Sequence, residues 1–271
     1  MSEAAEHLHV ETGADGVCRS TLDRPEAKHA LTVAMRDGIV DALRAGRADP
    51  AVRAFLVRAT GDAFCAGMDL GASTVAQAGK PGFDPRTTAE ALRVGVQTFI
   101  RELWEMDKPT VASVHGAAVG PGAHLALACD FVVTGPATKF LWSFHKWGLV
   151  VDAGGAYLLP RLVGLPRAKA MVMLGEGCSG AEAVDLGLAY RCADDTDGVA
   201  TTAEELATRL AAGPTRALGL SKKLLNASFE TDLTTSLELE GAYQSLATAS
   251  ADLVEGMVAF REKRPARFEG R

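Results

Sequence analysis

Apolar and polar residues alternate differently in the two parts of this chain. Short apolar runs bounded by turn residues predict strands at 17–22, 52–59, 111–114 and 131–133. Apolar residues three or four apart predict helices at 32–47 and 88–106. Beyond residue 150 almost all of the pattern is helical, and Ser179 with Glu182, and Thr202 with Glu205, each fit a capping box. Strands separated by helices and followed by a helical tail predict one α/β core with helices added at its end.

Composition narrows the class of protein without identifying it. The chain has 271 residues, 48% of them hydrophobic, and a net charge of −6, which favours neither nucleic acid nor an acidic membrane as a partner. No apolar run approaches the roughly 18 residues that a membrane span needs. The first residues are polar and acidic, unlike a signal or transit peptide, and the five scattered cysteines lack metal-ligand spacing. We therefore expect a cytoplasmic protein with reduced thiols and no metal site.

The most informative stretch is a glycine-rich turn that follows the strand at 111–114. Gly116, Gly120 and Gly122 mark the turn, and an unbroken run of small and apolar residues from Pro121 to Cys129 predicts a helix starting inside it. Backbone N–H groups and the positive end of a helix meet at such a turn, so it can bind an anion or an oxyanion. A dinucleotide site is excluded because the third glycine and the later acidic residue are missing. A nucleotide-phosphate loop is excluded because no Gly-Lys-Ser/Thr occurs.

A second turn of small residues, Gly61-Asp-Ala-Phe-Cys-Ala-Gly-Met-Asp-Leu70, follows the strand at 52–59. Each turn alone is a weak signal, but their combination and order are specific. Together with Arg24-Pro-Glu-Ala-Lys-His-Ala-Leu31 and the segments 108–130, 162–169, 179–188 and 255–264, they resemble the enoyl-CoA hydratase/isomerase (crotonase) family. The resemblance runs in order from about residue 8 to about residue 268.

This resemblance implies a fold, an assembly and a class of substrate. The expected fold is a spiral of repeated ββα units over residues 1–200, with a C-terminal helical trimerisation region over 201–271. The expected assembly is a homotrimer or a hexamer built as a dimer of trimers. The expected substrate is an acyl-CoA thioester, so CoA arrives as part of the substrate and no cofactor is bound permanently.

The resemblance also implies positions for the CoA moiety and for the thioester carbonyl. The implied CoA-binding residues are Lys28, Ala30, Leu31, Ala66, Asp69 and Leu70, with Lys263 contributed from a neighbouring subunit. The carbonyl would lie between two backbone N–H groups, those of Met68 and of residue 121. Residue 121 is Pro121, which has no N–H, so Gly122 is the candidate replacement donor.

The acid/base positions also depart from the family pattern. The two glutamates of the hydratases align with His124 and Phe144, and ordinary hydration is disfavoured because it needs one group to activate water and another to deliver a proton. Asp152 aligns with a catalytic aspartate of some members, and we expect Asp152, His124 and His145 to supply the chemistry. Asp152 could instead cap the following helix, and His124 could simply pack at the pocket or at the subunit interface.

Three aromatic residues near these positions, Trp142, Phe144 and Trp147, suggest a pocket for a flat or bulky acyl group, although core packing would explain them equally well. The leading hypothesis is an acyl-CoA thioester enzyme with an enolate-stabilising backbone site and a non-glutamate acid/base set. Two alternatives are a CoA-independent β-diketone hydrolase using His145 and Asp152, and a non-catalytic paralogue that binds acyl-CoA.

Overall fold

A computed structural model describes residues 6–72 and 74–271 of the chain. Its main sheet has six strands in the order β1-β2-β3-β4-β6-β9, and only β1 runs antiparallel to its neighbour. These strands are β1 (Leu8–Thr12), β2 (Val17–Leu22), β3 (Ala54–Ala59), β4 (Thr110–Val114), β6 (Phe131–Thr134) and β9 (Arg191–Cys192). A second sheet contains β5 (Ala117–Val119), β7 (Lys139–Leu141) and β8 (Cys178–Ser179), with β5 and β7 parallel.

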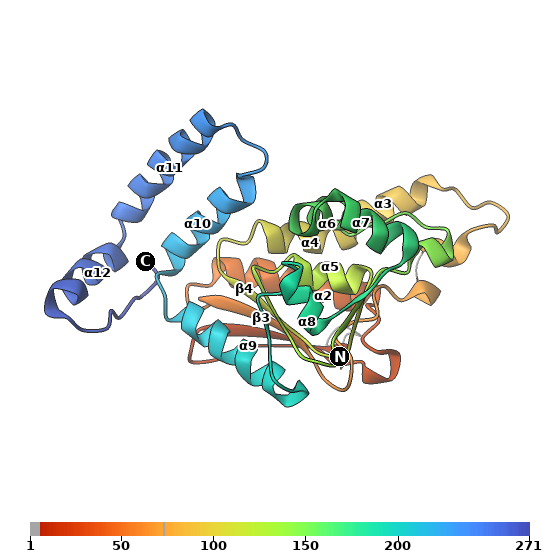
Figure 1. Cartoon of the computed structure of the whole chain (residues 1–271), viewed down its shortest axis with the longest axis horizontal. Helices are drawn as coiled ribbons and strands as arrows, with labels where there is room; N and C mark the ends of the chain where they lie inside the picture. The colour runs from red at the N-terminus through yellow and green to blue at the C-terminus, as the bar shows by residue number, and fades with distance from the viewer. Residues whose placement is uncertain (1–5, 73) are drawn as a thin grey trace.

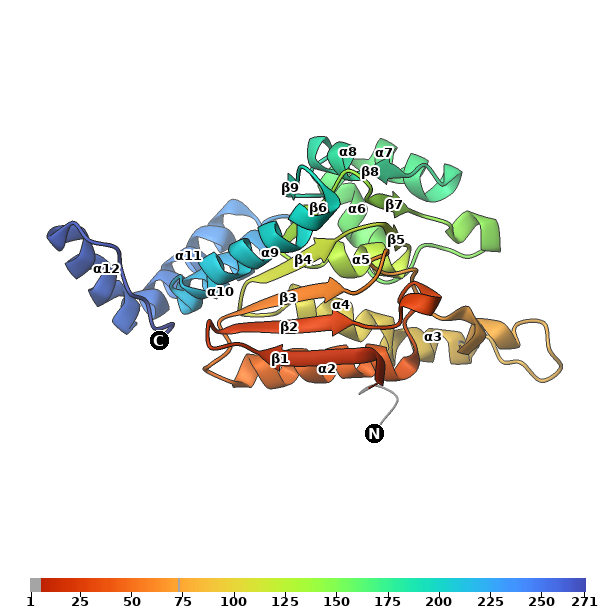
Figure 2. The ribbon, with the colours of Figure 1, turned by 90° about the horizontal axis from the view of Figure 1, so that it is seen from below.

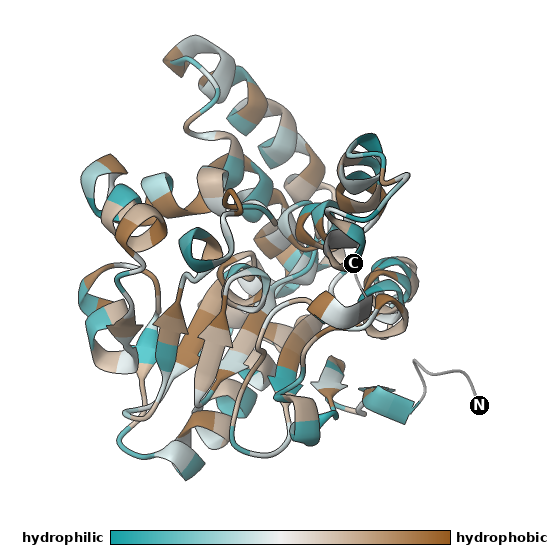
Figure 3. Cartoon of the chain, turned by 90° about the vertical axis from the view of Figure 1, so that its right-hand side faces the viewer, coloured by the Kyte–Doolittle hydropathy of each residue, from teal (hydrophilic) through white to brown (hydrophobic). Residues whose placement is uncertain are grey.

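Helices cover both faces of the main sheet, as parallel strands require (Figure 2). The helices of the core are α2 (Val33–Ala48), α3 (Arg86–Val94), α4 (Val96–Trp104), α5 (Pro121–Leu127), α6 (Gly155–Val163), α7 (Leu165–Lys169), α8 (Gly180–Asp185) and α9 (Thr196–Ala211). Short turns of helix are η1 (Pro25–Ala27), η2 (Leu70–Ala72), η3 (Thr74–Gln77), η4 (Phe144–Trp147) and the π-helical η5 (Ala170–Leu174). The strands β3, β4 and β6 in the sheet consist mostly of apolar residues, and the helices carry both apolar and polar positions (Figure 3).

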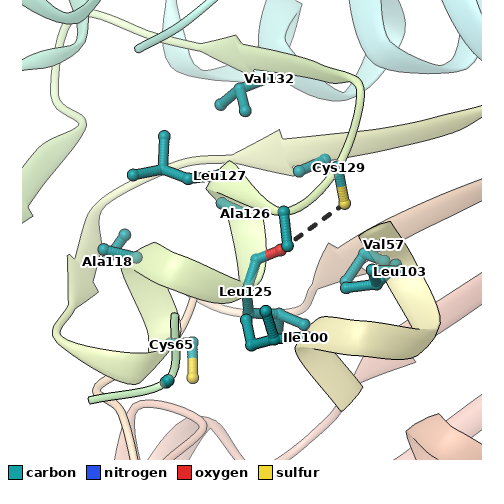
Figure 4. Packing of buried hydrophobic residues seen from close by; sticks show 14 of the residues in the cluster. Val57, Cys65, Ile100, Leu103, Ala118, Leu125, Ala126, Leu127, Cys129 and Val132 are labelled. Atoms are coloured by element: carbon teal, nitrogen blue, oxygen red, sulfur yellow. Dashed lines mark hydrogen bonds between the residues drawn. The ribbon is translucent and has the colours of Figure 1, made fainter. Parts of the chain in front are cut away.

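Two hydrophobic clusters hold these layers together. Helix α9 packs its apolar residues on one face of the sheet, against Val17, Leu56, Val111 and Val133. The larger cluster fills the other face, with α5 at its centre (Figure 4). Every residue of α5 after Pro121 is buried, so this helix is fixed from all sides and gives the glycine turn before it a rigid support.

Several elements agree with the sequence-based expectations, and two do not. The strand at 17–22 and the capping box of Ser179 with Glu182 are confirmed. The expected helix at 88–106 is two helices, α3 and α4, because the backbone breaks at Gly95, where a Cβ would lie 2.4 Å from the carbonyl of Ala91. The capping box at Thr202 is wrong: α9 begins earlier, and its N-cap is Asp195.

The C-terminal arm consists of α10 (Thr215–Ala227), α11 (Leu233–Thr248) and α12 (Ala251–Glu262), and it extends away from the core (Figure 1). Residue 200 lies inside α9, which packs on the sheet, so the structural boundary falls at Gly213 and Pro214 rather than at 200/201. Lys222 of α10 joins the arm to the core through an ion pair with Asp130 (3.0 Å). None of the described helices is both long enough and apolar enough to cross a lipid bilayer.

Candidate functional site

One pocket of about 300 Å³ gathers many of the residues singled out from the sequence. It lies where the segment after β3, the glycine turn before α5, helices α2 to α4 and the loop before α6 meet. The expected site residues that line it are Leu31, Ala66, Met68, Asp69, Leu70, Phe144, Trp147 and Asp152. Those outside its lining are Lys28, Ala30, Gly122, His124, Trp142, His145 and Lys263. The size is within the range of small-ligand sites.

The loop at 24–31, which the resemblance assigns to CoA, is held in a compact turn by the side chains of His29 and Arg24. The backbone N–H of Arg24 donates to His29 Nδ1 (2.9 Å), so the neutral ring donates from Nε2 to the carbonyl of Thr60 (2.8 Å). Burial lowers the pKa of His29, which keeps this arrangement neutral. Arg24 donates to the carbonyl of Ala30 (2.9 Å) and pairs with Asp69 (2.8 Å), so the loop and the pocket wall form one unit.

The backbone around Met68 leaves one N–H group facing the pocket. The N–H of Leu31 donates to the carbonyl of Gly67 (2.7 Å), and the N–H of Asp69 donates to the carbonyl of Leu31 (3.0 Å). This is a parallel bridge between Leu31 and Met68, and it turns the amide of Met68 away from Leu31. Within residues 6–72 and 74–271 no backbone acceptor takes this N–H, so it is available to a ligand oxygen.

The second expected donor is absent from this geometry. Pro121 lines the pocket and begins α5, and its ring carbon Cδ occupies the place of an amide hydrogen. A Cβ built on Gly67 would lie 3.3 Å from this Cδ, which shows how closely the two turns approach. Gly122 does not take over the role: it is buried against Cys65, where a Cβ would lie 2.4 Å from the carbonyl oxygen, and it is not part of the lining.

Asp152 reaches the pocket from a strained turn before α6. The N-cap of α6 is Gly154, with no side-chain cap, so Asp152 is not the capping residue that the sequence allowed. Ala153 between them has φ of 47°, a left-handed conformation that costs a non-glycine residue about 1–2 kcal/mol. Asp152 Oδ1 is buried and forms no hydrogen bond with any described residue. Burial raises the pKa of this carboxyl to about 6, so it can exchange a proton near neutral pH.

His124 lies behind the pocket wall and has no exposed surface. The indole N–H of Trp142 donates to its Nε2 (3.1 Å), which places the proton of the neutral ring on Nδ1. The ring stacks on Phe144 at 5.9 Å, and a Cβ on Gly155 would lie 2.2 Å from its Cε1. Burial lowers the pKa of His124 to about 4. The geometry therefore gives His124 a packing contact with the wall and with α6, and no direct access to a ligand.

The remaining expected residues lie outside or at the rim of the pocket. His145 is exposed and packs against Gly175 at the end of η5, since a Cβ there would lie 2.1 Å from its ring. Trp147 lines the rim and is 65% exposed. Lys263 is the C-cap of α12, in a left-handed conformation, and does not line the pocket.

The lining residues missing from the expected set include Arg36, Leu92, Val96 and Ser143. Leu92 and Val96 carry the helical apolar spacing of 88–106, but the sequence did not reveal which face meets a cavity. Arg36 pairs with Asp37 (2.7 Å) on α2, and the side chain of Arg36 is only 12% exposed. Ser143 could have been found only from the pairing of β5 with β7, two strands of three residues each.

Comparisons with known proteins agree with the motifs. A family model described as enoyl-CoA hydratase/isomerase matches residues 12–271. The chain is 38% identical over 267 residues to 1,2-epoxyphenylacetyl-CoA isomerase of Escherichia coli (strain K12), covering 97% of each protein. It is 30% identical to the mitochondrial methylglutaconyl-CoA hydratase of Mus musculus, covering 97% of this chain and 82% of that one. The crystal structure of an enoyl-CoA hydratase from Polaromonas sp. JS666 superposes with a TM-score of 0.88 at 30% identity, covering 97% and 99% of the two chains.

Proposed function

We propose that this chain, which belongs to the enoyl-CoA hydratase/isomerase family, is an acyl-CoA isomerase in which Asp152 moves one proton. The thioester carbonyl accepts a hydrogen bond from the N–H of Met68, and the CoA moiety lies along the loop at 24–31. Asp152 takes a proton from a carbon of the acyl group and returns it to another carbon. Water is neither consumed nor released.

The observation that carries this proposal is the unpaired carboxyl of Asp152. The other two charged residues of the pocket lining are each paired, Arg36 with Asp37 and Asp69 with Arg24. Asp152 is left as the acid/base group, with a pKa raised to about 6 by burial. A group with this pKa is ionised enough to remove a proton at neutral pH and acidic enough to give it back.

The balance of the reaction follows from a single carboxylate. The C–H bond breaks, the proton passes to Asp152, and the electron pair moves into a new C=C bond while charge develops on the thioester oxygen. The proton then returns from Asp152 to a different carbon, and the carbonyl forms again. Hydration needs a second group to handle water, and Phe144 and the buried His124 stand where the hydratase glutamates align.

The acyl group that fits best is flat or bulky and apolar. Phe144, Trp147, Leu92 and Val96 all line the pocket. Apolar walls and an aromatic face favour a ring over a short polar acyl group. The similarity to 1,2-epoxyphenylacetyl-CoA isomerase supports the same class of substrate.

The assembly of the protein is part of this proposal. Large apolar residues of the C-terminal arm are exposed, among them Phe229, Leu233, Met257 and Phe260. Exposed large apolar residues gathered on one part of a protein are typical of subunit interfaces. A homotrimer, or a hexamer of two trimers, would cover it and bring Lys263 to a neighbouring CoA. All five cysteines have free thiols, which suits a cytoplasmic enzyme.

The test is isomerisation of acyl-CoA thioesters in deuterated water. A panel of β,γ-unsaturated and aryl-substituted thioesters is followed by chromatography and mass spectrometry, which detects both the isomer and deuterium incorporation into the acyl group. Asp152→Asn is expected to lower both rates by about 10²–10⁴-fold. Asp41→Asn, which removes an exposed carboxylate on α2, is the matched control and should retain the parent's rates.

Three outcomes would contradict the proposal. A hydrated product formed equally well by Asp152→Asn would indicate a hydratase that uses other groups. Cleavage of a β-diketone without CoA would support the hydrolase, although His145 lies outside the pocket lining. Tight acyl-CoA binding without isomerisation or deuterium exchange across the panel would indicate a non-catalytic binding protein.

A further inference from the structure

The pocket holds one backbone donor for the thioester oxygen, although charge on that oxygen is usually stabilised by at least two donors. Met68 supplies an N–H, and Pro121 supplies a methylene carbon at the neighbouring position. Gly120 cannot help, because its own N–H donates to the carbonyl of Leu141 (2.9 Å). An enzyme with this geometry needs another donor near Pro121.

The small sheet brings Ser143 to the end of its strands where Pro121 begins α5. Strands β5 and β7 pair in parallel, with Ala117 opposite Lys139 and Val119 opposite Leu141. The N–H of Gly120 still donates to the carbonyl of Leu141 (2.9 Å), and Pro121 and Ser143 each follow the last bridged pair by two residues, at the same end of the two strands. The two chains remain in contact at this point, because a Cβ on Gly120 would lie 3.3 Å from the ring of Phe144. Pro121 and Ser143 both line the pocket.

The hydroxyl group of Ser143 is not used elsewhere in the described structure. Ser143 is the N-cap residue of η4, where a serine side chain ordinarily accepts a backbone hydrogen bond, yet it makes no such bond. Among the described residues no hydrogen-bond partner of its Oγ is found, although its backbone carbonyl accepts from the N–H of Lys146 (3.0 Å). The side chain is partly exposed, so the hydroxyl is free to turn toward a ligand in the pocket.

We propose that the hydroxyl of Ser143 is the second donor to the thioester oxygen and replaces the N–H that Pro121 lacks. This inference rests on the proposed function, because it needs a thioester carbonyl beside Met68. The oxygen then accepts from the N–H of Met68 and from the O–H of Ser143, on either side of the ring of Pro121. Ser143 touches the reacting group and is a catalytic residue in this sense.

A nucleophilic role for Ser143 has no support in the same geometry. A serine nucleophile needs a base within hydrogen-bonding reach. The histidine next to it in sequence, His145, is exposed and packs on Gly175. The buried His124 has its Nε2 occupied by Trp142.

The first experiment measures isomerisation by Ser143→Thr and Ser143→Val, which have nearly the same shape and differ in the hydroxyl. Ser143→Val is expected to lower kcat by about 10²-fold, and Ser143→Thr to stay within about tenfold of the parent. Pro121→Ala restores the backbone N–H. It should raise kcat by a much larger factor in Ser143→Val than in the parent, so the two substitutions should be strongly non-additive.

The second experiment reads the hydrogen bond without turnover. A thioester labelled with ¹³C at its carbonyl is bound to Asp152→Asn, and its C=O stretching frequency is measured by isotope-edited infrared spectroscopy. Loss of the Ser143 hydroxyl should raise this frequency toward its value in solution, and Pro121→Ala should lower it again. This readout would not move if Ser143 had only a structural role.

The outcomes separate this inference from the proposed function. An unchanged carbonyl frequency in a variant that still binds the thioester would overturn the role of Ser143 alone. Equal kcat values for Ser143→Thr and Ser143→Val would do the same. Failure of every thioester to bind the parent would overturn the proposed function, and the role of Ser143 with it.

Discussion

The chain surrounds the carboxyl groups of Asp130 and Asp152 in opposite ways. Asp130 Oδ2 accepts from the N–H of Thr110 (2.8 Å), from its hydroxyl (2.9 Å) and from the ammonium of Lys222 (3.0 Å). Asp152 Oδ1 is buried without a partner among the described residues. A satisfied carboxylate fixes one element to another, whereas an unsatisfied one in a pocket awaits a ligand or a proton.

The position of each group in the fold matches this difference. Asp130 follows α5 and ties the core to α10, where Gly219 approaches so closely that a Cβ would lie 1.9 Å from the carbonyl of Asp107. Asp152 stands on a turn that contains the strained Ala153 and is directed at the pocket. The contact between Asp130 and Lys222 therefore stabilises the fold. The strained turn and the unpaired carboxyl of Asp152 lower the stability of the folded state, and this cost is typical of active sites.

Removal of Lys222 tests the satisfied carboxylate and should have the largest effect on stability. Lys222→Met leaves the carboxylate of Asp130, whose side chain is 19% exposed, without its cation, so the free energy of unfolding should fall by about 2–3 kcal/mol. Isomerase activity per folded molecule should change little, because Lys222 is far from the pocket lining. Urea denaturation followed by circular dichroism measures the change.

The neighbouring Lys223→Met provides the control for this prediction, since Lys223 is exposed on the same helix. Its effect should stay within about 0.5 kcal/mol. Equal losses in the two variants would mean that the pair with Asp130 contributes no more than a surface charge does.

Removal of the charge from Asp152 should instead raise the free energy of unfolding. The ordinary pKa of an aspartate, which applies in the unfolded chain, is 3.8, whereas burial in the folded state raises the pKa of Asp152 to about 6. The folded state therefore binds more protons between these values, and the parent's stability falls as the pH rises from about 4 to about 6. Asp152→Asn lacks this loss, so at pH 7 it should be more stable than the parent by about 2 kcal/mol.

The measurement is the difference in unfolding free energy between Asp152→Asn and the parent at pH 4 and pH 7. The gain should shrink to about 0.5 kcal/mol near pH 4, where the folded carboxyl is protonated and the unfolded one is only partly ionised. Asp130→Asn should destabilise the protein at pH 7, because it weakens the bonds to Thr110 and Lys222. A gain at pH 7 from both substitutions would remove the distinction between the two carboxyl groups.

The sequence predicted the fold better than the side-chain environments of the site. The apolar pattern located β2 and α2, because burial on one face leaves a periodic signal in sequence. It missed the break at Gly95, since the close approach of Ala91 and Arg36 that requires a glycine is a tertiary contact. It also placed a capping box at Thr202, in the middle of α9. A four-residue motif does not show whether the helix has already begun further upstream, as α9 does after its N-cap Asp195.

At the site, the sequence predicted several of the residues that line the pocket. It did not predict which other residues their side chains contact. Met68 and Asp152 line the pocket as expected. The burial of His124 could not be predicted, because Trp142 and Gly155, which enclose it, lie 18 and 31 residues further along the chain. The absence of an N–H at Pro121 was visible in the sequence, but the place of Ser143 at the same end of the small sheet depends on the pairing of β5 and β7.

The pH dependence of turnover tests the difference between Asp130 and Asp152 with the smallest expected effect, because only the carboxyl of Asp152 is expected to titrate in the reaction. If Asp152 removes a proton in the first step, kcat/KM should rise tenfold for each pH unit up to about 6 and level off above it. Ser143→Val should lower the whole curve without moving its midpoint, since this residue acts on the oxygen and not on the base. Lys222→Met should leave both the height and the midpoint unchanged. A curve that instead falls as the pH rises through 6 would mean that the protonated carboxyl is the active form, and the proton would then be donated before one is removed.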